Sequence, residues 1–308
     1  MTTTTYSSPW AHNSVASFVA WGSALSAALQ TAGLHQTSDT GQIAWGSVSA
    51  LPAVSTAAGY EIYAFTDTLQ STSPIYVKIE YGTGAYSPAN GGPSIWITVG
   101  NATNGAGTIT GTNTGRIQIM GSWSNTGITT TTTPYPTFIC FNGSYLGVVL
   151  KSQGLYAASP GTAMGTMFMI GRGTDVSGNY VAQEVAFICT STSSQRNGPA
   201  APTHTCVNFT TNQMYSDGSG AWTMALFSPT FTSVNGTGFQ TYPCWAQWNQ
   251  VLPLNWAIFG LNAEIPAYAT VKAAPFGSTV HTYLMTGPAS YAWGLPANNN
   301  YSILMLWE

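Results

Sequence analysis

One segment near the N-terminus has apolar side chains at helical spacing. They recur every three or four residues, at Val15, Phe18, Val19, Ala24, Leu25, Ala28 and Leu29. Asn13 or Ser14 is a suitable N-cap before this run, and Gly33 is placed to end it. The spacing therefore predicts one helix, whose outer face carries serines instead of the usual charges.

Beyond Gly33 the period of the pattern changes from helical to alternating, which is typical of β-strands. In the stretch 75–81, Ile75, Val77, Ile79 and Tyr81 share one face. Asn104-Gly105 and Asn142-Gly143 are strong hairpin-turn signals. The strands predicted in this way are 61–65, 75–81, 95–99, 107–110, 116–120, 137–141, 144–151, 166–172, 180–190, 222–227, 256–259, 269–272, 279–285 and 301–307.

Many short strands, Gly/Asn/Pro turns and a single helix predict an all-β fold: an antiparallel β-sandwich or barrel-like domain with one N-terminal α-helix. The Thr-rich, Pro-containing stretch 122–136 predicts an exposed loop or a linker. We therefore expect an N-terminal helix-plus-β domain at 1–135 and a C-terminal β-sandwich domain at 136–308, or one continuous domain if the stretch is only a loop. The apolar C-terminal strand, 301–307, is expected to be buried on both faces or covered by a neighbour.

Charge is scarce. Only 5 % of the 308 residues are Asp, Glu, Lys or Arg, against about 25 % in typical soluble domains. The six basic residues are scattered singly, which argues against nucleic acid and anionic membrane surfaces as partners. No run approaches the roughly 18 consecutive apolar residues of a spanning helix, and residues 1–6 lack the features of a signal peptide, so we expect no membrane segment and no secretion.

No arrangement of residues predicts catalysis, a metal site or a cofactor. The carboxylates are not paired in sequence, and Glu184, the one strand carboxylate placed near Arg172, fits a structural ion pair as well as catalysis. The four histidines lack metal-ligand spacing. The segments 82–84, 105–107 and 171–173 fit no phosphate-binding motif, and each predicts a turn.

The four cysteines contain no CxxC pair. Two disulfides are compatible with their number, but buried free thiols are favoured in a chain without a signal peptide.

Aromatic residues predict one binding site. Tyr242, Trp245 and Trp248 lie in a polar stretch, and aromatic rings beside amide side chains can stack on sugar rings. The alternatives are that these rings fill a core or a protein–protein interface.

The stretch 59–84, GYEIYAFTDTLQSTSPIYVKIEYGTG, together with the upstream helix and 37–42, TSDTGQ, resembles a family of virion structural proteins of tailed bacteriophages, associated with the tail, baseplate or neck. The resemblance covers 15–111. It implies a structural protein without enzymatic activity, made in the host cytoplasm and assembled into the virion with other copies of itself and other virion proteins. No functional residues carry over from it.

This reading assigns Phe18, Trp21, Leu25 and Leu29 to a partner-binding helix face, with a helix packed on its own domain as the alternative. Removing residues 1–35 is then expected to leave a folded protein that no longer enters particles. Two further functions stay open: a glycan-binding receptor-recognition module using Tyr242, Trp245 and Trp248, and a head decoration protein.

Overall fold

The fold is described from a computed structural model. The structure describes residues 1–9, 14–53, 56–83, 93–120, 134–151, 165–175, 179–189, 204–208, 213–216, 241–247, 251–261, 268–274, 279–285 and 301–308. Within these residues the strands form three antiparallel sheets, and the chain has one α-helix, α1 (Val15–Ala32). The predicted all-β sandwich with one N-terminal helix is therefore confirmed.

The N-terminal and C-terminal sheets are each built from one continuous part of the chain, whereas the central sheet combines the first strand with strands from the middle of the chain. The N-terminal sheet has the order β2-β3-β4-β5-β6, with β7 also paired to β5. Its strands are β2 (His35–Gln36), β3 (Ala57–Ala64), β4 (Tyr76–Thr83), β5 (Pro93–Thr103), β6 (Ile109–Asn113) and β7 (Ile117–Met120). Short 3-10 helices lie in two of its connections: η1 (Trp45–Ser47) and η2 (Thr68–Ser71).

The central sheet has seven strands in the order β1-β8-β9-β10-β11-β12-β13. They are β1 (Thr2–Pro9), β8 (Pro134–Phe141), β9 (Tyr145–Lys151), β10 (Gly165–Thr174), β11 (Tyr180–Cys189), β12 (His204–Asn208) and β13 (Gln213–Ser216). The C-terminal sheet has the order β14-β15-β18-β17-β16. Its strands are β14 (Thr241–Gln247), β15 (Val251–Leu261), β16 (Thr270–Ala273), β17 (His281–Met285) and β18 (Tyr301–Leu306).

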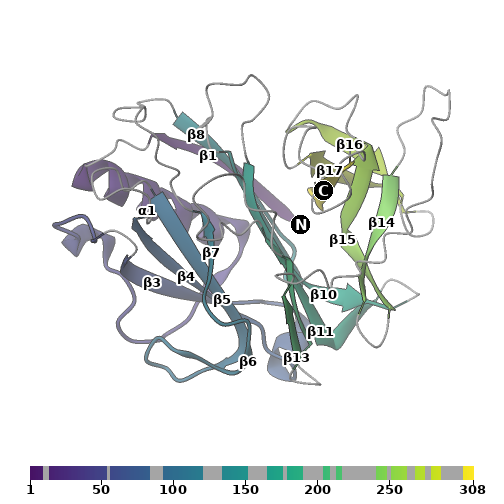
Figure 1. Cartoon of the computed structure of the whole chain (residues 1–308), viewed down its shortest axis with the longest axis horizontal. Coiled ribbons are helices and arrows are strands. Elements are labelled where there is room, and N and C mark those ends of the chain that lie inside the picture. The colour runs from purple at the N-terminus through teal and green to yellow at the C-terminus, as the bar shows by residue number, and fades with distance from the viewer. Residues whose placement is uncertain are drawn as a thin grey trace.

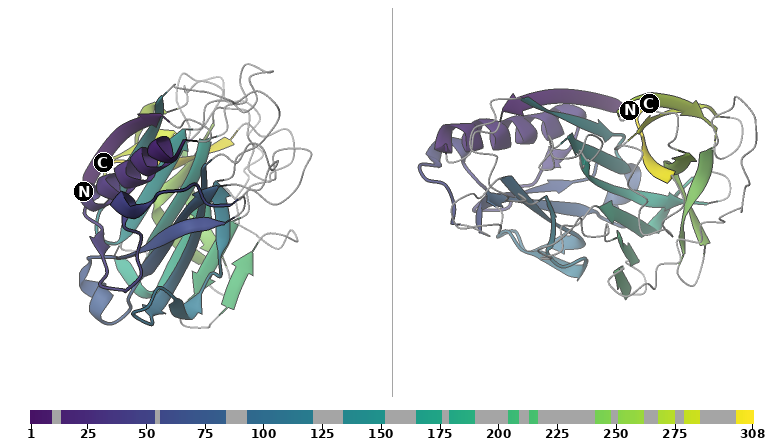
Figure 2. Two further views of the ribbon diagram at one scale, coloured as in Figure 1. Left: turned by 90° about the vertical axis from the view of Figure 1, so that its left-hand side faces the viewer. Right: turned by 45° about the horizontal axis from the view of Figure 1, so that its top comes forward.

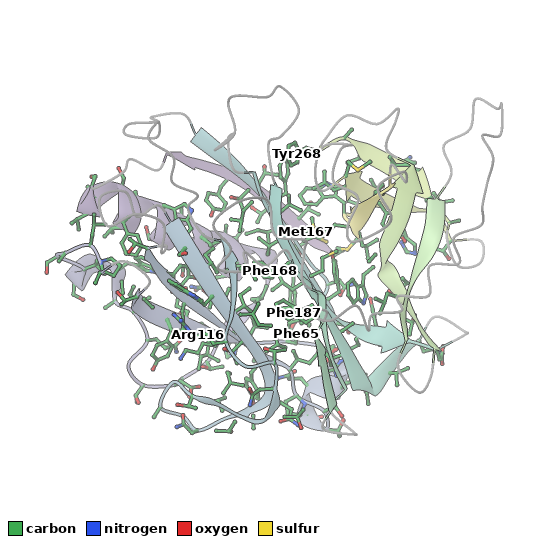
Figure 3. All side chains as sticks on the ribbon, viewed as in Figure 1. Phe65, Arg116, Met167, Phe168, Phe187 and Tyr268 are labelled. Carbon is green, nitrogen blue, oxygen red and sulfur yellow. The ribbon has the colours of Figure 1, made fainter. Side chains whose placement is uncertain are left out.

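The sheets stack in three layers, with the central sheet in the middle (Figure 1). One face of the central sheet packs on the N-terminal sheet and α1, and the other packs on the C-terminal sheet. Phe168 and Met167, neighbours in β10 that are labelled in Figure 3, therefore belong to two different cores. This explains why β9 and β10 have nearly continuous apolar sequences, as strands buried on both faces do.

The helix is where the periodicity predicts it. The Ser14 side chain accepts a hydrogen bond from the Ser17 N–H, and Gly33 ends the helix with a left-handed φ of 111°. By length and mean hydropathy α1 would also qualify as a membrane span, and a buried core helix meets the same test. In this structure the helix packs on β1, β8 and η1.

Several predicted hairpins are confirmed. β8 and β9 flank Asn142-Gly143, with Gly143 at a φ of 91° that glycine adopts without strain. β5 and β6 flank the Asn104-Gly105 turn. Leu304, Met305 and Leu306 of the last strand are buried, as its apolar run predicts. The predicted strand 222–227 and the loop 191–203 lie outside the described residues.

One strand was not predicted, and two kinds of local prediction are wrong: the loop at 134–136 and the glycine turns. Residues 2–9 form β1, which no alternation of apolar residues signals. Pro134 and Pro136 belong to β8 instead of a loop. At that end β8 pairs with β1, and no described residue forms a ladder with it on the other side, which is a position that proline tolerates in a strand. Gly82 lies within β4, and the segment 171–173 lies within β10, so neither glycine-rich piece forms the expected turn.

The division of the chain at residue 135 stays a prediction. β1 pairs with β8 along its whole length, from Thr2 opposite Phe141 to Pro9 opposite Pro134. The C-terminal end of the chain also contacts this pair of strands, because the thiol of Cys140 in β8 donates a hydrogen bond to the Trp307 carbonyl, just after β18, at 3.6 Å. Both termini accordingly lie next to each other (Figure 2).

Candidate functional site

The four helix residues assigned to partner binding lie in the core of their own chain. Phe18, Trp21, Leu25 and Leu29 are at most 4 % exposed. Trp21 and Trp45 of η1 both contact the ring of Tyr81 in β4 edge to face. In this conformation the four side chains present almost no surface to another chain. The structure also argues against a folded protein without residues 1–35, because their removal would delete β1 and this part of the core.

The residues assigned to glycan binding are only partly described. Tyr242 and Trp245 lie in β14, at the edge of the C-terminal sheet, opposite Phe259 and Pro253 of β15. Their side chains and all of Trp248 lie outside the described part of the structure. The glycan site therefore stays a prediction.

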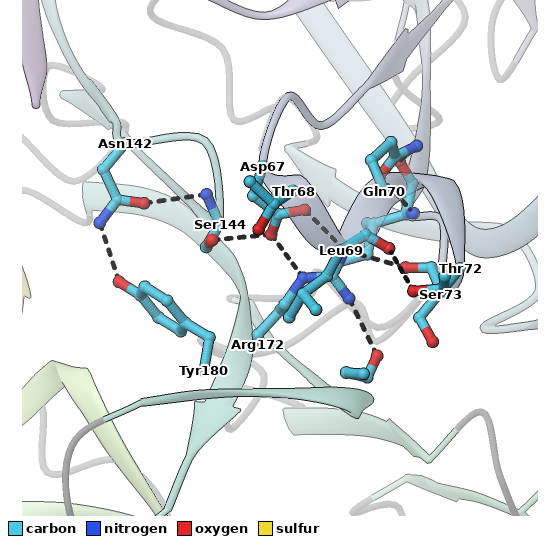
Figure 4. A network of polar contacts seen from close by, with 12 residues as sticks. Asp67, Thr68, Leu69, Gln70, Thr72, Ser73, Asn142, Ser144, Arg172 and Tyr180 are labelled. Atoms are coloured by element: carbon cyan, nitrogen blue, oxygen red, sulfur yellow. Dashed lines mark hydrogen bonds and ion pairs between the residues drawn. The ribbon is translucent and has the colours of Figure 1, made fainter.

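An extensive polar network of the described residues surrounds Arg172 in β10 (Figure 4). The Arg172 guanidinium is fully buried and binds both carboxylate oxygens of Asp67, at 2.5 and 3.0 Å. It also donates to the backbone carbonyls of Ser73 and Ala182, at 2.8 and 3.0 Å. Ser144 donates a further hydrogen bond to Asp67 at 2.7 Å. The Arg172–Asp67 pair thus joins the η2 loop of the N-terminal sheet to β10, to β11 and to the turn between β8 and β9.

The ionic partner that the structure shows for Arg172 is Asp67, and the side chain of Glu184, which strand alternation placed near Arg172, lies outside the described structure. Arg172 lies opposite Val185 in the β10–β11 ladder, whereas Asp67 arrives from the connection between β3 and β4. The two residues are 105 positions apart, and no spacing rule connects them.

The backbone at Arg172 also contacts the C-terminal sheet. Trp256 of β15 donates its indole N–H to the Arg172 carbonyl at 2.9 Å. Its ring lies against Gly171, where an added Cβ would be 2.7 Å from the indole nitrogen. Gly171 is therefore needed for a close approach between layers, and not for a turn.

A second network surrounds Glu61, which is only 2 % exposed. Its carboxylate accepts hydrogen bonds from the Ser26 hydroxyl of α1 (2.7 Å), the Trp45 indole (3.3 Å) and the hydroxyls of Tyr63 (2.8 Å) and Tyr81 (2.5 Å). Burial raises the pKa of both tyrosines, and the Glu61 charge adds to it, so both stay protonated donors. The four donors satisfy the buried carboxylate and fix α1 and η1 on the N-terminal sheet.

Asp39 is a third internal carboxylate. It accepts hydrogen bonds from the hydroxyls of Thr37 and Thr103 and from the Gly107 N–H, which ties the loop after β2 to the β5–β6 hairpin. Burial alone would raise the pKa of Asp39, but these hydrogen bonds outweigh it and lower the pKa below its usual value.

On the outer face of the N-terminal sheet, cations cover the aromatic rings. The Lys78 ammonium lies 4.4 Å from the Tyr60 ring centroid, and the Arg116 guanidinium lies 4.2 Å from that of Trp96. Arg116 also pairs with Glu80 at 2.8 Å. Both cations are thus engaged within the sheet, and the two rings that they cover are not free to stack on a sugar.

The described residues offer no assembled reactive centre. Among them, no group of three or more His, Cys, Asp or Glu side chains could hold a metal ion. Cys140 is a free, buried thiol, as favoured for the cysteines, and burial raises its pKa to about 12, which leaves it unreactive. The side chains of Cys189, Cys206 and Cys244 lie outside the described structure.

A surface hollow of about 620 Å³ lies between the loop 41–52 and the first residues of β3. Its walls are made mostly of small and apolar residues and backbone. The polar side chains in them are the Gln42 amide and serine and threonine hydroxyls, and no charged side chain is among them. It has the volume of a ligand pocket but lacks the convergent polar groups that orient a ligand.

No protein-family model matches the chain, and no curated protein matches it either.

Proposed function

We propose that this chain is a structural subunit of a tailed-bacteriophage virion, at the tail, baseplate or neck, that assembles through contacts with other copies and other virion proteins. The observation that supports it most is where the few charges lie. Asp39, Glu61, Asp67 and Arg172 all hold loops and layers together inside the protein. Each of these carboxylates accepts three or more hydrogen bonds from its own chain, so none is presented to a substrate.

A surface poor in charge suits dense packing of identical subunits, because like-charge repulsion between copies is removed. A structural subunit also requires that its sheets keep fixed positions relative to one another. The network around Arg172 and the contact of Trp256 with Gly171 fix the three layers to one another. The resemblance of 59–84 to virion proteins agrees with this role.

To test the proposal, phage particles are purified from bacterial cultures that carry the gene for this chain. Quantitative mass spectrometry then counts the copies of the chain in each particle. A tail or baseplate subunit is expected at six copies or a small multiple of six, and hundreds of copies would support a head decoration protein instead. Absence of the chain from purified particles would refute both. A glycan array with the purified chain tests the receptor-recognition alternative separately.

A further inference from the structure

The first strand is an edge of the central sheet. β1 pairs with β8 on one side, and no described strand pairs with it on the other. Its eight residues keep a regular register with β8, without a bulge. Residues 2–8 contain no charge and no proline, and Pro9 is the last position of the strand. Such an edge presents a row of unpaired backbone N–H and C=O groups that can pair with another strand.

The other described sheet edges differ from β1. β14 contains Pro243 and a shift of register at that residue. β16 has four residues, one of them Lys272. β2 has two residues, β13 has four, and β6 and β7 have five and four, each with a register shift in its pairing to β5. Short length, charge, proline and bulges are the usual features that prevent edge pairing, and β1 alone has none of them within residues 2–8.

The helix α1 lies on the core-facing side of β1 and leaves the opposite face of the strand accessible. Tyr6 packs on the core to which α1 contributes, so α1 lies against the core-facing side of the strand. Thr5 points to the opposite face from Tyr6 and is exposed. In both views of Figure 2, β1 runs along the outline of the molecule.

We infer that β1 pairs antiparallel with β1 of a second copy, which joins two central sheets into one sheet across a two-fold axis. A two-fold axis perpendicular to the sheet keeps the two core faces aligned, and residues directly opposite then share a face. With the axis at Thr4, that residue faces the partner's Thr4, and Thr3 faces the partner's Thr5.

The sequence of the edge favours a second copy as its partner. Residues 2–5 are four consecutive threonines, so Thr–Thr pairs form across the axis, and such pairs are stabilising in antiparallel sheets. No charge repels an identical strand. A foreign strand is usually selected through pockets for alternate side chains, and β1 offers hydroxyl and methyl groups instead.

Sedimentation velocity on the purified full chain tests the pairing. The wild-type chain is expected to sediment as a dimer of 32.4 kDa subunits, with a dissociation constant below about 100 µM. The double variants T3K/T5K and T3E/T5E place like charges directly opposite each other, and each is expected to raise the dissociation constant about tenfold or more. An equimolar mixture of the two variants should restore the dimer, because Lys then faces Glu.

The control is T270K, which adds a lysine at an exposed threonine of β16 and should leave the dimer unchanged. If a double variant loses its thermal transition, T5K and T5E, at the exposed position alone, replace it. Their like charges then lie diagonally across the axis, so a smaller rise of the dissociation constant is expected, and the mixture of the two should again reverse it. A monomeric wild-type chain at about 100 µM, or variants that dimerise as well as wild type, would overturn the inference.

The inference deepens the proposed assembly role but can fail independently of it. A chain that is monomeric yet present in particles would refute the β1 pairing and leave the virion role intact. A chain that dimerises through β1 but is absent from particles would do the reverse.

Discussion

The two interfaces of the central sheet are built from different chemistry. On the side of the N-terminal sheet, aromatic and branched aliphatic side chains surround the buried carboxylate of Glu61, and Asp67 joins the layers through Arg172. On the side of the C-terminal sheet, the described core is rich in methionine and tyrosine and contains no ion pair. Its described polar contacts include single hydrogen bonds to backbone carbonyls, such as those of Trp256 and Tyr283.

This difference indicates that the N-terminal interface holds one fixed arrangement of side chains, whereas the C-terminal interface adjusts to small shifts. A buried carboxylate with four donors tolerates only one arrangement, because any lost donor leaves charge without a partner. Methionine, in contrast, fills irregular gaps and accepts small shifts. We therefore expect the N-terminal interface to be sensitive to single polar substitutions and the C-terminal interface to be sensitive mainly to steric ones.

The largest effect is expected at Arg172, which contacts both neighbouring layers. Arg172→Met removes the ionic partner of Asp67 and should lower the free energy of unfolding by about 3–5 kcal/mol. Chemical denaturation measures the change. In a double-mutant cycle, Asp67→Asn should recover part of the loss, because the unpaired carboxylate is then absent. Lys272→Met, at an exposed position, is the control and should change stability by less than about 0.5 kcal/mol.

A smaller effect, confined to the C-terminal interface, is expected for Gly171→Ala. The added methyl group would lie 2.7 Å from the Trp256 indole nitrogen, and such overpacking costs about 1–3 kcal/mol. Thermal and chemical unfolding measure the loss, and Trp256 fluorescence should shift as the ring moves. Gly46→Ala is the matched control, since an added Cβ there meets nothing within 4 Å. Equal losses in the two variants would refute the steric explanation.

The smallest effect is expected at Asp39, on the N-terminal side, and it depends on pH. Because the folded-state pKa of Asp39 is lowered, its ionised form stabilises the fold above the pKa of the unfolded chain, and this contribution disappears as pH falls through the folded-state pKa. Asp39→Asn should therefore cost about 1 kcal/mol at pH 7 and less at about pH 3. A stability difference that stays constant between these pH values would contradict this.

Local sequence signals predicted the local structure well. The caps at Ser14 and Gly33, and the Asn142-Gly143 turn, depend on neighbouring residues, and the structure has them as expected. The networks were not predictable in this way, because Asp67 and Arg172 meet only after three sheets have stacked. β1 was missed for a related reason: its threonines are selected by pairing with β8, and they carry no apolar alternation of their own.

The pairing of β1 with β8 has a consequence for synthesis. Thr2 cannot pair until Phe141 has been synthesised. At about 5–20 residues per second, β1 therefore stays unpaired for on the order of 10 s while the ribosome makes β8. A strand of valine or isoleucine would be prone to aggregate during that time. Threonine keeps the branched side chain that suits a sheet and adds a hydroxyl that water solvates. The uncharged threonine run thus lets the first strand of the chain remain in water until its partner emerges.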